Sequence, residues 1–338
     1  MRARTKPRSS LPKTSQEAAD YFADSANCHN YLVSRRWPRG VRCPQCGSES
    51  VYFDSSRNGW ECKTRHPKRK FTLKTGTIFE DSALGLDKWL PCIWIIANAK
   101  SRVGSHEIAR AIGVTQKTAW FMLQRIRLAL QDDSGGNGGK LGGEVEVDET
   151  FIGGKARNMH ASKRKALIAS FPAKREYLHG QPVMSLTNKV AVLGMLERGA
   201  DGTSRVRTMP VQGTKRHQLQ GKIREHVDEG STLYTDSLRS YRNLNDYTHE
   251  FIDHTTEYMR GNVHTNGMES YWSLLKRALH GTYISVEPFH LFRYLDEQAF
   301  RFNNRVKTDA QRFALAIAGV VGKRLTYAEL IAADAGTV

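Results

Sequence analysis

The sequence has few cysteines, few acids relative to its bases, and no long apolar run. No segment approaches the ~20 apolar residues of a membrane-spanning helix, and the basic start MRARTKPRSS has no apolar segment behind it. We therefore expect a cytoplasmic protein with no membrane partner. Five cysteines, three of them grouped at positions 43, 46 and 62, fit metal ligation in a reducing compartment better than a disulfide framework.

The scarcity of acids leaves a strong positive charge. Against 51 Lys and Arg the chain carries 34 Asp and Glu, a net charge of +17, which favours a polyanionic partner such as double-stranded DNA. Residues 155–175 hold seven Lys or Arg and no acid. We expect Lys163, Arg164 and Lys165 in this run to touch DNA, although a solvated loop is the plainer interpretation.

Organisation along the chain predicts a multidomain α+β protein. The glycine-rich segment 134–143 cannot hold a helix or strand and is interpreted as a flexible linker. The expected parts are a basic flexible arm (residues 1–20), a zinc ribbon (21–80), a helix-turn-helix module (81–133) and the linker (134–143). They are followed by an α/β catalytic domain with a mixed sheet (144–310) and a C-terminal tail (311–338).

The ribbon is predicted from CPQC at 43–46 and from Asn58-Gly59, a hairpin signal between two β-type runs. Zinc takes four sulfur or nitrogen ligands in a tetrahedron, and the expected set is Cys43, Cys46, Cys62 and His66. Cys28 beside His29 is an alternative to His66, and Cys92 is expected to be an ordinary buried residue. So small a module needs the metal to fold.

The helix-turn-helix is predicted from SHEIARAIGV followed by TQKTAWFMLQRIRLAL. Thr115 is well placed to cap the second helix. The residues expected to bind DNA are Gln116, Lys117 and Thr118 in the major groove, and Arg125 and Arg127 at the backbone. An αα-hairpin used for packing is the alternative.

An α/β domain follows the linker. Strands are expected at 144–154, where acids and valines alternate, at 189–199, at 204–212 and at 231–236, with a helix near 214–228. Asp148 and Asp236 are expected at strand ends, where functional groups collect in open α/β sheets. Two carboxylates brought together need a cation between them, and hard oxygen ligands suit Mg²⁺ or Mn²⁺.

The segment HTNGMESYWSLLKR at 264–277 predicts a helix with two neighbouring rows. One row is polar (Asn266, Glu269, Ser273 and Lys276) and the other apolar (Met268, Trp272, Leu275 and Leu279). A polar row at the edge of a buried face suggests a cleft, in which Glu269 would be a third carboxylate and Lys276 would lie near DNA phosphate. The alternative is that both solvate a helix edge.

Together, the zinc ribbon, the helix-turn-helix, VEVDETFIGGK, YTDSLRSY, HTNGMESYWSLLKR and YLDEQAFRFNNR resemble the bacterial insertion-sequence transposases that join a zinc ribbon to a DDE-type (ISXO2-like) domain. The resemblance implies a ribonuclease H-like fold, with Asp148 and Asp236 as catalytic acids. The third position holds Asn or Glu in this family, followed by Lys. Glu269 is favoured here, since Lys276 follows seven residues later, while Asn266 remains an alternative ligand or helix-orienting residue.

The implied function is transposition. The enzyme would bind the terminal inverted repeats of its element, hydrolyse a phosphodiester at each end with Mg²⁺ or Mn²⁺, and join the freed 3′-hydroxyl to target DNA. Two ends imply a homodimer or higher oligomer on DNA in the bacterial nucleoid. The alternatives are a DNA-binding regulator or decayed copy without catalysis, and a general nuclease.

Overall fold

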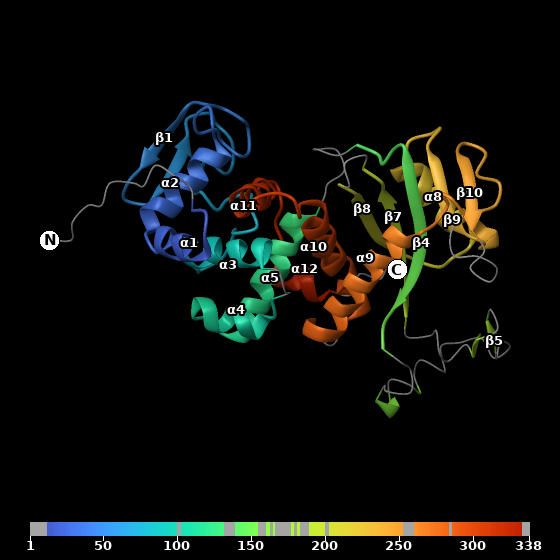
Figure 1. Cartoon of the computed structure of the whole chain (residues 1–338). Coiled ribbons are helices and arrows are strands. Elements are labelled where there is room, and N and C mark those ends of the chain that lie inside the picture. The colour runs from blue at the N-terminus through green and yellow to red at the C-terminus, as the bar shows by residue number, and fades with distance from the viewer. Residues whose placement is uncertain are drawn as a thin grey trace. The chain divides into compact units, whose positions relative to one another are not determined.

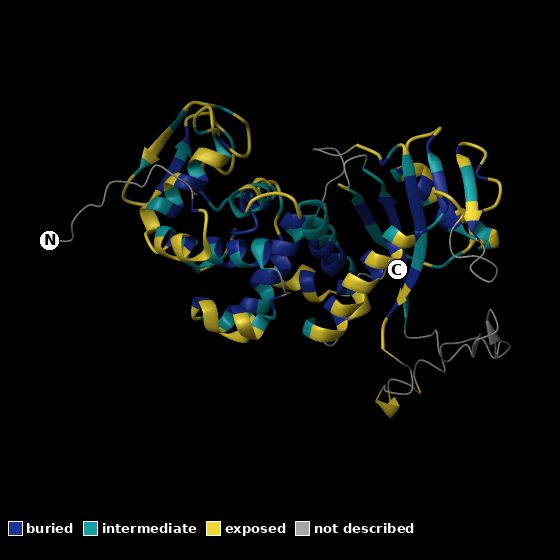
Figure 2. Ribbon diagram, in the orientation of Figure 1, coloured by how far each residue is buried: buried dark blue, intermediate teal, exposed yellow. Residues whose placement is uncertain are grey.

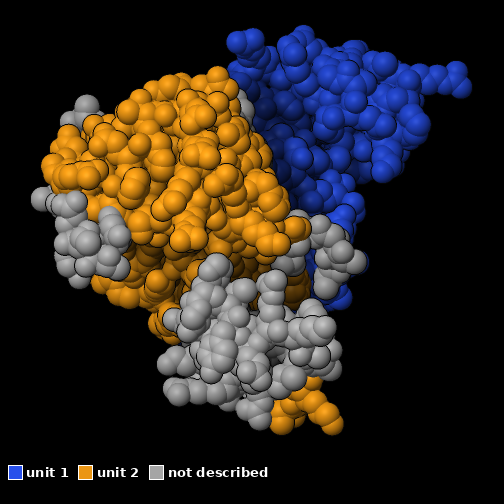
Figure 3. Space-filling view, turned by 90° about the vertical axis from the view of Figure 1, so that its right-hand side faces the viewer, with its two compact units in different colours: residues 1–131, 304–332 blue, residues 132–303, 333–338 orange. Residues whose placement is uncertain are grey.

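The computed structural model describes residues 12–99, 103–131, 139–154, 160–162, 165, 177–178, 181–182, 189–199, 203–252, 260–283 and 286–332. The chain divides into two compact units, coloured separately in Figure 3. Unit 1 comprises residues 1–131 and 304–332, and unit 2 comprises residues 132–303 and 333–338. The chain thus leaves unit 1, forms unit 2 and returns to unit 1.

Unit 1 is mostly helical with one small sheet (Figure 1). Its elements are α1 (Ser15–Phe22), α2 (Ser25–Arg36), β1 (Val51–Asp54), β2 (Gly59–Cys62), β3 (Lys70–Phe71), α3 (Leu86–Asn98), α4 (Ser105–Ile112), α5 (Gln116–Leu130), α11 (Asp309–Ala318) and α12 (Tyr327–Ile331). The predicted hairpin is present, since β1 and β2 pair antiparallel and Asn58 between them has a φ of 47°. Asn tolerates this left-handed conformation better than most residues, which explains its place in the turn.

The C-terminal segment is part of the core of unit 1. Phe313 of α11 is 1% exposed, and its ring centroid lies 5.2 Å from that of Phe22, 5.5 Å from that of Tyr31 and 5.2 Å from that of Trp94. These partners come from α1, α2 and α3, so one aromatic side chain joins four helices. The expected tail at 311–338 is therefore wrong for α11 and α12. Likewise, α1 begins inside the range expected to be a flexible arm.

Unit 2 is built on a five-stranded mixed sheet in the order β10-β9-β4-β7-β8. The strands are β4 (Glu144–Ile152), β7 (Val190–Glu197), β8 (Arg205–Val211), β9 (Thr232–Asp236) and β10 (Thr248–Ile252). β4, β7 and β8 run antiparallel in sequence, while β9 is parallel to both β4 and β10. This is the mixed sheet expected of a ribonuclease H-like domain. A separate short hairpin pairs β5 (Tyr177–Leu178) with β6 (Gln181–Pro182).

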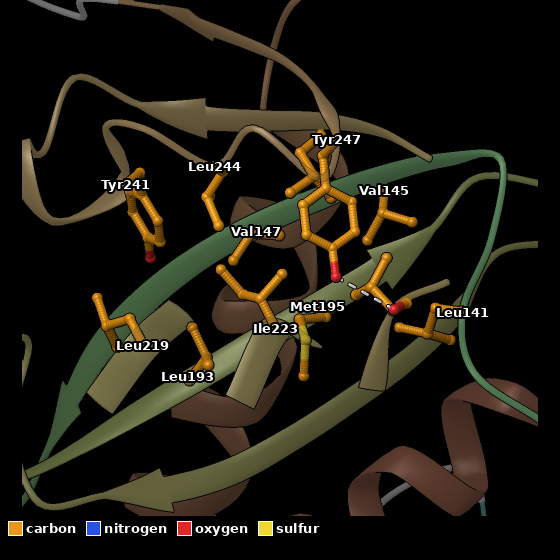
Figure 4. Packing of buried hydrophobic residues seen from close by; sticks show 12 residues of the cluster. Leu141, Val145, Val147, Leu193, Met195, Leu219, Ile223, Tyr241, Leu244 and Tyr247 are labelled. Carbon is orange, nitrogen blue, oxygen red and sulfur yellow. Dashed lines mark hydrogen bonds between the residues drawn. The ribbon is translucent and has the colours of Figure 1, made fainter. Parts of the chain in front are cut away.

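Helices cover both faces of this sheet. The remaining elements are α8 (Arg216–His226), η2 (Arg239–Tyr241), α9 (Asn266–Ala278), the π-helical turn η3 (Leu279–Tyr283), η4 (Pro288–His290) and α10 (Leu291–Asn303). On one face, the α8 face, Val145 and Val147 of β4 pack with Leu219 and Ile223 of α8 (Figure 4). On the opposite face, the α9 face, side chains of β7 and β8 pack under α9 and α10.

The central strands β4 and β7 are largely buried between these layers (Figure 2). Burying valine, leucine and methionine on both sides of a sheet provides most of the driving force for such a three-layer domain. Within the described part of the chain, no helix has the length and apolar character needed to cross a bilayer.

Replacement of Phe313 with alanine tests whether the C-terminal segment completes unit 1. Because the truncation leaves a cavity among four helices, we expect it to lower the free energy of unfolding by ~3–5 kcal/mol. Urea unfolding of the full chain followed by tryptophan fluorescence reports on unit 1, which holds five of the six tryptophans. Val306→Ala, at a side chain that is 67% exposed, is the control. Equal stability of the two variants would contradict the assignment.

Candidate active site and metal centres

Three cysteines and one histidine meet in the small sheet of unit 1. The ligand atoms of Cys43, Cys46, Cys62 and His66 all lie within 4.8 Å of one another. Cys43 Sγ lies 3.4 Å from His66 Nε2, and Cys46 Sγ lies 3.7 Å from Cys62 Sγ. Three sulfurs and one imidazole nitrogen this close form a set suited to tetrahedral zinc in a closed structural site.

Cys28 does not belong to this set. It is fully buried in α2, where its thiol donates a hydrogen bond to the Phe22 carbonyl at 3.2 Å. The alternative in which Cys28 replaces His66 is therefore wrong, and the expected ligand set is retained. Cys92 is also fully buried, as expected of an ordinary core residue.

Alternation along β4 separates its acids from its valines. Val145 and Val147 are fully buried on the α8 face. Glu146 and Asp148 therefore project to the α9 face, because successive side chains of a strand point to opposite sides. The predicted strand is present with Glu146 and Asp148 on one face, but the next acid, Glu149, lies on the other face.

Pairing in the sheet brings Asp148 opposite Asp236. β4 and β9 are parallel, and their last registered pair is Glu146 with Tyr234. Two residues further along each strand lie Asp148 and Asp236, so both carboxylates project to the same face just beyond the end of this ladder. Asp236 ends β9 as predicted, but Asp148 does not end β4, which continues to Ile152 because it stays paired with β7.

Helix α9 lies over this position. Its apolar row is buried as predicted, with Met268, Trp272 and Leu275 at 4% exposure or less. The Trp272 indole donates a hydrogen bond of 2.9 Å to Asp148 Oδ2. This close approach depends on Gly194, which is registered opposite Asp148 on β7, since a Cβ there would lie 2.2 Å from Met268 Cε and 2.5 Å from the Trp272 ring.

The polar row of α9 is present and is exposed at Asn266, Glu269, Ser273 and Lys276. Glu269 lies three residues before Trp272, close enough for its charge to act on Asp148. Asn266 is the first residue of the helix, and its backbone N–H points to His264 Nδ1 at 3.4 Å. Asn266 carries no charge and has no such link to compare, so Glu269 as the third acidic group stays a prediction.

Crowding of carboxylates changes the protonation of Asp148. Burial raises the pKa of Asp148 to about 6, and the negative charges of Asp236 and Glu269 add to the rise, while the hydrogen bond from Trp272 opposes it. A carboxylate whose ionised form is disfavoured in this way gains from a nearby cation. The donor set therefore fits a hard divalent cation.

The carboxylates are not drawn together as tightly as the zinc ligands. Among the described residues, the ribbon set is the single group of three or more acidic, cysteine or histidine side chains with ligand atoms mutually within 4.8 Å. Mutual repulsion between acids explains a looser arrangement.

The sequence-based reasoning missed a fourth acid, Glu149. Its carboxylate accepts a short hydrogen bond from the Tyr241 hydroxyl on the α8 face. Burial raises the pKa of Glu149 to about 7, the bond from Tyr241 opposes this, and the charges of Asp236 and Asp148 add to the rise. Its partly buried place beside the other acids was not visible in the alternating pattern, which assigns a residue to one face of a strand but does not identify its neighbours across the sheet.

The expected DNA-binding residues of α5 separate into two groups. Thr115 caps the helix as predicted and accepts a hydrogen bond from the Thr118 N–H, while Gln116 and Lys117 at its start are exposed. Lys117 Nζ also lies 5.2 Å from the Tyr327 ring centroid in α12. This end of α5 remains available to a polyanion.

Arg125 and Arg127 of the same helix are buried, with exposures of 4% and 1%. Arg125 donates hydrogen bonds to the carbonyls of Leu325, Ile78 and Glu80 at 2.8–2.9 Å. The expectation that both arginines meet the DNA backbone is therefore wrong, because they are enclosed within the protein. In the basic run at residues 155–175, here called the basic insertion, Lys165 is exposed, whereas Lys163 and Arg164 lie outside the described residues.

Zinc content tests the ribbon site directly. We expect Cys62→Ala and His66→Ala to lose stoichiometric zinc and to unfold the hairpin, because a small metal site needs all four ligands. Cys28→Ala is the control and keeps its zinc. Atomic absorption of the purified variants gives the result, and zinc retained by His66→Ala but lost by Cys28→Ala would contradict the assignment.

Comparison with known proteins identifies the family of the chain. Residues 140–303 match the family model of an ISXO2-like transposase domain, and residues 23–64 match that of a transposase zinc-ribbon domain. An uncharacterized protein in transposable element ISH50 of Halobacterium salinarum is 28% identical over 292 residues, which cover 84% of this chain and 92% of the relative. An uncharacterized transposase-like protein of Haemophilus influenzae is 32% identical over 102 residues, 30% of this chain and 82% of the relative. The chain belongs to the insertion-sequence transposases that carry a zinc ribbon and an ISXO2-like transposase domain.

Proposed function

We propose that the protein is an active DDE-type DNA transposase, which cuts the ends of its element and joins them to target DNA with a divalent cation. The observation that carries the proposal is the meeting of Asp148 and Asp236 beyond the β4–β9 ladder, beneath a helix whose Glu269 acts electrostatically on Asp148. Acids crowded in this way are costly to a fold, which supports a role that needs them.

Asp148, Asp236 and Glu269 would hold Mg²⁺ or Mn²⁺. When bound, the cation supplies activation of the attacking water or 3′-hydroxyl and neutralises charge on the phosphodiester. The protein contributes orientation: the Trp272 indole fixes the Asp148 carboxylate through Oδ2, and β9 holds Asp236 at its last position. Asn266, one turn before Glu269, is a candidate oxygen ligand in its place.

Lys276 would bind the DNA backbone. It lies seven residues after Glu269 on the same exposed row of α9, about 10 Å further along the helix at 1.5 Å per residue. At that distance its ammonium group would contact a phosphate next to the one that reacts.

Recognition of the element ends is assigned to unit 1. Helices α4 and α5 are joined through Gly113, whose φ of 68° allows the turn of a helix-turn-helix. Gln116, Lys117 and Thr118 at the start of α5 would then enter the major groove of the terminal inverted repeats. The zinc ribbon and the basic insertion, including Lys163, Arg164 and Lys165, would add phosphate contacts, in keeping with the net charge of +17.

Two DNA ends must be handled in one reaction, so we propose a homodimer or larger assembly on DNA. Transfer needs no covalent bond between protein and DNA, because the freed 3′-hydroxyl is itself the nucleophile. The competing function is a DNA-binding regulator derived from a transposase that has lost catalysis.

The test is cleavage and joining of labelled DNA that carries the sequences flanking the gene, with Mg²⁺, Mn²⁺ or EDTA. We expect metal-dependent joining by the wild type and a loss of at least ~10³-fold in Asp148→Asn and Glu269→Gln, because a lost charge-stabilising group typically costs that much. Asn266→Ala is expected to stay active.

Three results would change the account. Tight binding of the flanks without cutting under either metal would favour the regulator. Loss of joining in Asn266→Ala together with activity in Glu269→Gln would make Asn266 the third ligand. Cutting of unrelated DNA at the same rate as the flanks would indicate a general nuclease.

A further inference from the structure

Glu146 is a buried carboxylate on the α9 face that the catalytic assignment leaves unexplained. It lies two residues before Asp148 on β4 and is 1% exposed. One of its oxygens, Oε2, accepts a hydrogen bond of 2.8 Å from the backbone N–H of Met268, and Oε1 accepts one of 2.8 Å from Arg198 Nε. A charge this deeply buried is tolerated only when it is paired and hydrogen-bonded, as it is here.

The bond to Met268 anchors the start of α9. Met268 is the third residue of the helix, and the N–H groups of a first turn have no partner within the helix. Thr265 at the N-cap makes no side-chain capping bond. Glu146 takes over this role from another element, and its negative charge suits the positive end of the helix dipole.

Gly267 makes room for this carboxylate. A Cβ at Gly267 would lie 2.9 Å from Glu146 Oε2 and 3.0 Å from Oε1. The glycine is thus explained by the close approach of a strand side chain to the helix backbone.

Arg198 ties the same carboxylate to the loop before the helix. It follows β7 directly and donates hydrogen bonds of 2.8 Å to the carbonyls of Asn262 and His264. Its guanidinium also lies 4.4 Å from the centroid of the Tyr234 ring on β9. The pair of Glu146 and Arg198, here called the Glu146 clamp, therefore joins β4, β7 and β9 to the N-terminus of α9.

The clamp acts one residue before the third acid. Because each helical residue advances 1.5 Å and rotates ~100°, a small slip at Met268 moves Glu269 away from Asp148. Reaction rates fall steeply with displacements of about 1 Å in catalytic groups.

We propose that Glu146 and Arg198 are positioning residues, which set the register of α9 so that Glu269 completes the cation site. The proposal rests on the proposed function in its assignment of Glu269. It adds that cation affinity depends on a carboxylate that does not itself bind the cation.

The experiment measures Mn²⁺ binding by electron paramagnetic resonance and metal-dependent DNA cleavage, in wild type and in Glu146→Gln. We expect Mn²⁺ affinity and cleavage to fall by about 10–100-fold, as is typical when a group that orients a ligand is lost. The control is Glu197→Gln, which breaks a pair with Arg205 between β7 and β8. Its Mn²⁺ affinity is expected to match that of wild type.

Gly267→Ala is a second variant in case Glu146→Gln does not fold. It keeps every charge and favours helix, yet its methyl group would displace the Glu146 carboxylate. A positioning role predicts weaker Mn²⁺ binding in Gly267→Ala even when the variant is fully folded. A role in fold stability alone predicts unchanged Mn²⁺ affinity in every variant that remains folded, and this result would overturn the proposal.

A double-mutant cycle with Glu269→Asp shows whether the clamp acts through the third acid. If it does, Glu146→Gln has a much smaller effect on Mn²⁺ affinity in the Glu269→Asp background than in wild type. Independent, multiplying effects would contradict the proposal. Failure of the proposed function is a separate result: a wild type that cuts no DNA yet binds Mn²⁺ with the same dependence on Glu146 would leave the clamp intact and remove the transposase activity.

Discussion

The alternation of side chains along β4 is the constraint on which the structure of unit 2 depends. Val145 and Val147 pack in the apolar layer against α8, while Glu146 and Asp148 lie on the opposite face. A single strand thereby serves both the core and the proposed cation site, and a shift of register by one residue would exchange the two faces. The parallel ladder with β9 then ends before Asp148, so that Asp236 meets it where the backbone pairing stops.

Helix α9 covers the sheet face that carries Asp148 and contributes side chains to the proposed cation site. Gly194 lets Trp272 approach the sheet, and the indole bond to Asp148 joins the helix to the strand at the first acid. The cost is a group of carboxylates in a partly buried place, seen in the raised pKa values of Asp148 and Glu149. Carboxylates whose ionised forms are disfavoured reduce the stability of the unit, so the proposed function and stability oppose each other here.

Local patterns were enough to predict most of unit 2. The strands near 144–152, 190–197, 205–211 and 232–236 and the buried row of α9 follow from alternation and helical spacing, which depend on neighbours in sequence. Contacts between distant segments were not predictable in this way. Arg125 was predicted from sequence to bind DNA. The fold instead places the carbonyls of residues 78, 80 and 325 around its guanidinium group. The same holds for Phe313, whose partners lie some 220 to 290 residues earlier.

The identity of the third cation ligand is the central point to test. Asn266 and Glu269 are neighbours on one exposed face of α9, and Glu269 is the proposed ligand. The most direct measurement is anomalous diffraction from crystals of the protein grown with Mn²⁺. The account predicts one Mn²⁺ peak or more between the carboxylates of Asp148, Asp236 and Glu269. A peak bound by Asn266 without Glu269, or no peak on the α9 face at saturating Mn²⁺, would contradict it.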